Sequence, residues 1–118
     1  GHFVTRIVGN SMNKRIPDGV WCLFKANPGG SRNNKVVIIQ HQDIQDQDTG
    51  ASFTIKIYTS EKNKDGITNK KVVLCPDSTD STYKNLVFEA ESVNELKVVA
   101  ELVAVIGWNV NQIGVNIN

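Results

Sequence analysis

The sequence predicts a mostly β domain of antiparallel strands with at most short helical turns. Segments rich in Val, Ile, Phe, Tyr and Thr recur along the 118 residues, and clusters of Gly, Asn, Asp and Ser separate them. This rhythm is typical of antiparallel sheets. The length and the 40% hydrophobic content suit one packed core, so we expect residues 3–118 to form a single domain.

Seven segments fit strands, because each is rich in β-branched or aromatic residues and is bounded by turn formers. Gly9 follows the first segment, and Pro17-Asp18-Gly19 precede the second. Turns at 28–31, 48–50 and 64–66, or polar segments, separate the others. The expected strands are residues 3–8, 20–25, 35–41, 52–60, 70–75, 86–89 and 97–108.

Other segments are expected to connect or extend these strands. Residues 40–50 are polar and acidic, which predicts a hairpin excursion on the surface. One helical turn is expected at 11–15, before Pro17, and another at 92–96, with Ser92 as N-cap and Glu95 as its capping-box partner. Residues 109–118 mix Val and Ile with Asn and predict an edge strand that pairs with another subunit.

Composition excludes several classes of protein. The chain has 13 Lys and Arg against 12 Asp and Glu, so it lacks the basic field that drives nonspecific nucleic-acid binding. No apolar run approaches the roughly 20 residues of a membrane helix. Cys22 and Cys75 are isolated and are expected to be buried reduced thiols of a cytosolic protein, with a disulfide as the alternative. His2 and His41 are too isolated to form a catalytic triad, and we expect neither a metal nor an organic cofactor.

A serine and a distant lysine are the residues that carry chemistry. Ser11 follows Gly9-Asn10, and a glycine there permits a sharp turn that leaves the next backbone N–H groups free as an oxyanion hole. A Ser-Lys pair performs acyl transfer without histidine, because a neutral amine takes the hydroxyl proton. On spacing alone, a turn serine that bonds to its own backbone remains the alternative.

The strand pattern by itself argues against Lys56 as a base. Alternation places Phe53, Ile55 and Ile57 on one face and Lys56 on the other, with Thr54 and Tyr58. Such a lysine is expected to be solvated, with a pKa of about 10.4, and therefore protonated. Catalysis requires that this face is covered, because burial lowers the pKa of a lysine by up to several units.

The order of the motifs resembles that of LexA-like peptidases, the family of LexA, the UmuD mutagenesis protein and lambda-type phage repressors. The motifs span nearly the whole chain: Gly9-Asn10-Ser11-Met12, Ile16-Pro17-Asp18-Gly19, the apolar strand at 35–39, Thr54-Ile55-Lys56, the run at 73–78, and Ile106-Gly107. The first motif also resembles type I signal peptidases, whose membrane anchor and further motifs are not found in this sequence.

The resemblance implies a partly barrel-shaped β domain with Ser11 as nucleophile and Lys56 as general base. It implies an oxyanion hole formed by the backbone N–H groups of Asn10 and Ser11. The supporting turn consists of Gly9, Met12, Asp18 and Gly19. From the residues themselves, packing is the simpler interpretation of Met12, and a turn that opens the next strand is the simpler interpretation of Asp18-Gly19.

The resemblance also implies a biological setting. Members of the family usually cleave their own chain once and dimerise through this domain. They act in the cytoplasm, in DNA-damage or phage-type transcriptional control, and a recombinase filament is their co-activator. Their scissile bond lies well upstream of the serine, so we expect this chain to be the C-terminal part of a longer protein that contacts DNA only through a missing N-terminal domain. The alternatives are a catalytically silent dimerisation or regulatory module and a peptidase that acts in trans.

The spacing between Ser11 and Lys56 departs from the compact repressors, because it is longer. The excursion at 43–50 is the expected place for the surplus residues. Loop entropy grows slowly with length, so the dyad geometry is expected to survive the insertion.

Overall fold

The apolar segments form seven strands in the computed structural model, which describes residues 1–109. The strands are β1 (His2–Arg6), β2 (Trp21–Ala26), β3 (Lys35–Gln40), β4 (Phe53–Lys62), β5 (Asn69–Cys75), β6 (Leu86–Glu89) and β7 (Lys97–Gly107). A single short helix, α1 (Glu91–Asn94), lies between β6 and β7 within the described residues. The prediction of a mostly β fold is confirmed.

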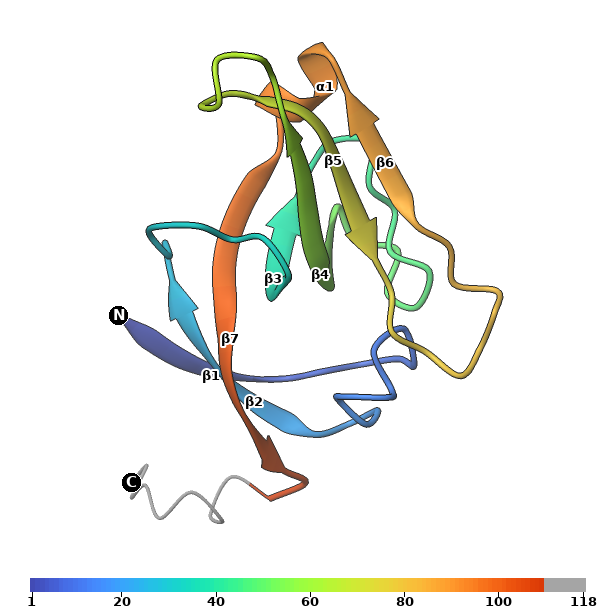
Figure 1. Ribbon diagram of the computed structural model, residues 1–118. Helices are drawn as coiled ribbons and strands as arrows, with labels where there is room; N and C mark the ends of the chain where they lie inside the picture. The colour runs from blue at the N-terminus through green and yellow to red at the C-terminus, as the bar shows by residue number, and fades with distance from the viewer. Residues whose placement is uncertain (110–118) are drawn as a thin grey trace.

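All seven strands belong to one sheet in the order β1-β2-β7-β3-β4-β5-β6, and every neighbouring pair is antiparallel. The long strand β7 pairs with β3 through its first half and with β2 through its second half. Figure 1 shows the resulting twist: β4, β5 and β6 stand side by side, and β1 and β2 run across the other end. In the described part of the chain β1 and β6 do not pair, so the sheet is curled but is not closed into a barrel.

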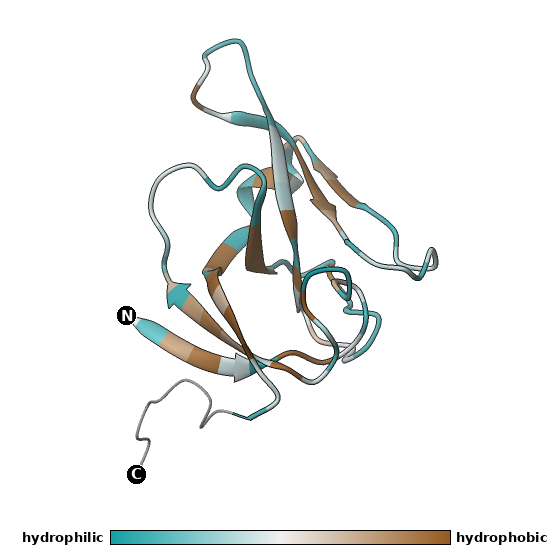
Figure 2. Ribbon diagram, turned by 60° about the horizontal axis from the view of Figure 1, so that its bottom comes forward, coloured by the Kyte–Doolittle hydropathy of each residue, from teal (hydrophilic) through white to brown (hydrophobic). Residues whose placement is uncertain are grey.

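Two hydrophobic clusters stabilise this sheet. The first cluster joins the turn after β1 to the strands β2, β3 and β7, and the second lies between β3, β4, β5, β6 and α1. Figure 2 shows hydrophobic residues along the strands and hydrophilic residues in most of the connections. The buried members of the first cluster are Ile7, Met12, Ile16, Val20, Cys22, Phe24, Val36 and Ala100; those of the second are Val37, Ile39, Ile44, Tyr58, Val72, Leu74, Phe88 and Val93.

One of the two helical predictions needs correction. Helix α1 begins one residue earlier than expected, Ala90 is its N-cap, and no side chain caps it, so the capping box of Ser92 and Glu95 is wrong. Ala90 has a φ of 53°, and this sharp turn out of β6 lets α1 bury Val93. The segment at 11–15 forms the single helical turn that was expected, in which the N–H groups of Arg15 and Ile16 both donate to the carbonyl of Met12.

Three further expectations concern the loops, thiols and chain end. Residues 41–52 connect the paired strands β3 and β4, as expected of a hairpin excursion. Both cysteines are free thiols; Cys22 is buried and Cys75 is half-buried. The expected edge strand at 109–118 lies almost entirely outside the described residues. In the part of the chain that the structure describes, no helix is long and apolar enough to cross a membrane.

Candidate active site

The turn that carries Ser11 is fixed by the residues predicted to support it. Gly9 has a φ of 98°, a conformation that favours glycine. Its N–H donates to the Asp18 carboxylate over 2.7 Å, and the N–H of Gly19 donates to the carbonyl of Ile7 over 2.8 Å. Met12 lies in the first hydrophobic cluster with 1% of its surface exposed. Asp18 and Gly19 therefore open β2 and also hold the serine turn.

The segment at 77–83 lies against the same turn. The Ser11 carbonyl accepts the N–H of Asp77 over 2.9 Å, and the Asp77 carbonyl accepts the N–H of Lys14 over 3.1 Å. The Ser78 hydroxyl donates to the Asn10 carbonyl over 2.7 Å. These contacts tie the serine turn to the connection between β5 and β6, so both sides of the turn are restrained.

The structure brings the two predicted dyad residues together. The Nζ of Lys56 lies 3.1 Å from the Oγ of Ser11, and each residue is 5% exposed. Alternation predicts Lys56 on a solvated face, and that prediction is wrong: Thr54 is also buried, whereas Phe53 is 51% exposed. The pattern fails because the serine turn and the excursion between β3 and β4 cover the polar face of β4.

Lys56 has two further hydrogen bonds beside the one to Ser11. Its Nζ donates to Thr54 Oγ1 over 2.8 Å and to the Ile55 carbonyl over 3.0 Å. Burial lowers the pKa of Lys56 below its ordinary value, and the carboxylates of Asp46 and Asp48 oppose this shift by Coulomb attraction. The balance leaves an amine that loses its proton more easily than a surface lysine does.

Asp46 is a site residue that the sequence analysis missed. One of its oxygens accepts the Thr54 hydroxyl over 2.6 Å. The other accepts the N–H groups of Asp48 and Thr49 and the Thr49 hydroxyl. Burial opposes ionisation of Asp46, but these hydrogen bonds outweigh it and lower the pKa of the carboxyl. The Asp-x-Asp-Thr sequence, which is typical of an Asx turn, and a threonine two positions before the lysine were the signals available.

One N–H group of the predicted oxyanion hole already has a partner. The Asn10 N–H donates to the Tyr83 hydroxyl over 3.3 Å, and that hydroxyl donates to the Asp48 carboxylate over 2.8 Å. An acyl oxygen that binds to Asn10 must therefore displace the Tyr83 hydroxyl.

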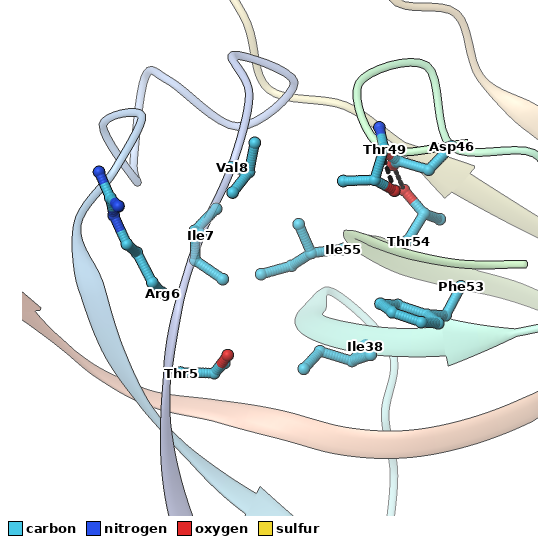
Figure 3. Close-up of a pocket in the computed structure, with 10 residues that line it drawn as sticks. All are labelled: Thr5, Arg6, Ile7, Val8, Ile38, Asp46, Thr49, Phe53, Thr54 and Ile55. Carbon is cyan, nitrogen blue, oxygen red and sulfur yellow. Dashed lines mark hydrogen bonds between the residues drawn. The ribbon is translucent and has the colours of Figure 1, made fainter. Parts of the chain in front are cut away.

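An apolar pocket of about 130 Å³ adjoins the dyad. One wall is the end of β1 and the two residues that follow it, Ile7 and Val8, and the other is the start of β4 with Phe53 and Ile55. Figure 3 shows Ile7 and Ile55 pointing toward one another across it. Neither dyad residue lines the pocket, but Thr54, which accepts a hydrogen bond from Lys56, and Asp46, which accepts one from Thr54, both do.

No family model and no curated protein matches this chain. Within residues 1–109 no group of three or more His, Cys, Asp or Glu side chains is arranged to hold a metal ion.

Proposed function

We propose that this domain is a serine endopeptidase in which Ser11 is the nucleophile and Lys56 is the general base. The observation that carries the proposal is the 3.1 Å contact between their side-chain tips, both of them buried. A structural lysine is rarely buried without a carboxylate in direct contact; here the contacts of Nζ are two hydroxyls and a carbonyl. Burial lowers the pKa of this amine, which favours the neutral form that a base requires.

The chemistry follows from that contact. Neutral Lys56 takes the hydroxyl proton while Ser11 Oγ bonds to the substrate carbonyl carbon. The peptide C–N bond breaks, and the proton passes from Lys56 to the leaving amine. Water then attacks the ester, gives a proton to Lys56, and the ester C–O bond breaks as Ser11 regains its proton. Asn10 and Ser11 N–H groups are proposed to stabilise the oxyanion in both steps.

The substrate is proposed to bind as an extended peptide between β1 and β4. β1 is an edge strand, and in the described residues β5 pairs with β4 only from Ile57 onward, so 53–55 pair on one side only. Unpaired strand edges accept an added strand through main-chain hydrogen bonds. The apolar pocket between them has room for a small or branched aliphatic side chain.

The resemblance to LexA-like peptidases extends the proposal. The substrate is a bond in the protein's own upstream chain, the domain forms a homodimer, and cleavage in the cytoplasm regulates a DNA-damage or phage-type transcriptional response, with a recombinase filament as co-activator. Neither a cofactor nor a membrane has a part in this scheme.

A serine-reactive fluorophosphonate tests the proposal. The wild-type domain is expected to form a covalent adduct that peptide mapping assigns to Ser11, and the Ser11→Ala and Lys56→Ala variants are expected to form none. Ser31→Ala and Lys35→Ala are matched controls, because both change exposed side chains. An adduct that survives Ser11→Ala, or no adduct in the wild type at any pH, contradicts the proposal.

A catalytically silent dimerisation or regulatory module is the second candidate. The β7 residues Val103 and Val105, two positions apart on that strand and therefore on one face of it, are 52% and 42% exposed, and exposed apolar patches mark interaction sites. Size-exclusion chromatography beside the labelling assay separates the candidates, since a silent module is a dimer that never reacts at Ser11. Cleavage of an added peptide supports action in trans.

A further inference from the structure

A chain of hydrogen bonds leads from the dyad into the excursion between β3 and β4. Lys56 Nζ donates to Thr54 Oγ1 over 2.8 Å, and Thr54 Oγ1 donates to Asp46 Oδ1 over 2.6 Å. Thr54 is 4% exposed, so water does not readily replace either partner. The short contact at the carboxylate is characteristic of a charge-assisted hydrogen bond.

The hydrogen bonds from Lys56 to Thr54 and from Thr54 to Asp46 have a fixed donor-to-acceptor direction. A threonine hydroxyl has a single proton, whereas an ionised carboxylate only accepts. The lowered pKa of Asp46 keeps it ionised at neutral pH. The Thr54 hydroxyl therefore donates its proton to the Asp46 carboxylate, and only the lone pairs of Thr54 Oγ1 remain to accept a hydrogen bond from Lys56.

The direction matters when Lys56 is neutral, because an uncharged amine has two N–H bonds and one lone pair. Nζ has three neighbours: Thr54 Oγ1, the Ile55 carbonyl and Ser11 Oγ. The first two accept the N–H bonds, so the lone pair faces the Ser11 hydroxyl. If Thr54 were free to donate, its proton would compete with Ser11 for that lone pair.

We propose that Asp46 is a positioning residue of the dyad, which aims the lone pair of neutral Lys56 at Ser11 by fixing Thr54 as an acceptor. This role rests on the proposed peptidase function. Asp46 has no hydrogen bond to Ser11 or to Lys56. It acts on Lys56 through Thr54, which donates to Asp46 and accepts from Lys56.

Asp46→Asn tests this direction with little change of shape. Asp46 Oδ2 accepts three donors from Asp48 and Thr49, so the single oxygen of an asparagine is expected to stay there. Its NH₂ group then faces Thr54 and donates to it. The Thr54 hydroxyl turns its proton toward Lys56, and the chain is reversed.

The same substitution also removes a charge. The charged groups that act on Lys56 in the described residues are the carboxylates of Asp46 and Asp48, and both raise its pKa. Loss of the Asp46 charge is expected to lower the pKa of Lys56. Asp46→Asn therefore has two separable effects, a shift of the pH profile to lower pH and a fall of its upper plateau.

The experiment measures the rate of fluorophosphonate labelling at Ser11 against pH for the wild type, Asp46→Asn, Thr54→Val and the double variant. We expect Asp46→Asn to lower the plateau about tenfold or more, a part of the 10²–10⁴ that a general base contributes, and to shift the midpoint to lower pH. In the Thr54→Val background, Asp46→Asn is expected to shift the midpoint without a further fall of the plateau.

Asp65→Asn is a matched control. Asp65 accepts the same kind of turn hydrogen bonds, from the N–H groups of Ile67 and Thr68 and from the Thr68 hydroxyl, in the hairpin between β4 and β5. It is expected to leave the profile unchanged. Urea denaturation of each variant checks that the fold is retained.

The outcomes separate this role from the proposed function. Wild-type protein that never labels contradicts the peptidase and the role of Asp46 together. If the wild type labels normally, two results overturn the role of Asp46 and leave the peptidase proposal intact. One is an unchanged plateau in Asp46→Asn. The other is a plateau that Asp46→Asn lowers by the same factor in the Thr54→Val background as in the wild type. A ¹³Cε titration of Lys56 reads the charge effect separately and without activity; the pKa of Lys56 is expected to fall in Asp46→Asn and to fall equally in the double variant relative to Thr54→Val.

Discussion

Gly9→Ala is expected to destabilise the domain because two separate penalties meet at this position. The φ of Gly9 is 98°, and a left-handed backbone costs a residue with a Cβ about 1–2 kcal/mol. A Cβ at Gly9 would also overlap the Asp48 carboxylate. The carboxylate must move and lose its hydrogen bond from Tyr83, which adds about 1 kcal/mol. The expected loss of unfolding free energy is therefore about 2–3 kcal/mol.

Urea denaturation of a set of variants separates the two penalties. Gly30 has a φ of 75°, and a Cβ added there would have no other atom within 4 Å, so Gly30→Ala measures the backbone penalty alone, about 1–2 kcal/mol. In an Asp48→Gly background, which also removes the Asp48 Cβ that a Cβ at Gly9 would meet at 2.8 Å, Gly9→Ala is expected to cost no more than Gly30→Ala does. Equal losses for Gly9→Ala in the presence and absence of the Asp48 side chain would refute the proposed overlap of the serine turn with the excursion.

Two further predictions concern reactivity. The labelling rate at Ser11 is expected to rise with pH as Lys56 loses its proton. Because burial lowers the pKa of Lys56, the midpoint of this rise is expected below the ordinary lysine value of about 10.4. A midpoint at or above that value, measured by titrating the rate against pH, contradicts a desolvated base. Tyr83→Phe is expected to raise the labelling rate at Ser11 by up to about fivefold, because it releases the Asn10 N–H from a hydrogen bond worth about 1 kcal/mol. A large fall of the labelling rate in the same assay contradicts this expectation and shows that the Tyr83 hydroxyl is needed to hold the serine turn.

Much of the fold was predictable from the sequence because strand signals are local. Each expected strand matches an observed one to within two residues at either end, since β-branched runs and turn residues act over a few positions. The capping box failed because the backbone at Ala90, rather than a side chain, begins α1. Pattern arguments describe side-chain preferences and miss such a turn.

The site was predictable only in part. The serine turn was accessible from its motif, but the strand pattern predicted that the face carrying Lys56 is solvated, whereas that face of β4 is buried. Alternation separates two faces and does not say which one is covered, and here the cover comes from residues distant in sequence. Asp46 was missed for a related reason: a polar excursion is typical of a solvated loop, whereas this one directs a carboxylate inward to Thr54.

Chemical rescue of Lys56→Ala tests the central claim most directly, because it asks whether an uncharged amine activates Ser11. The variant is expected not to react with the fluorophosphonate by itself. Added ethylamine is expected to restore labelling at Ser11, at a rate that follows the concentration of the free base as pH is varied. Labelling of Lys56→Ala at the wild-type rate without any amine would contradict the account.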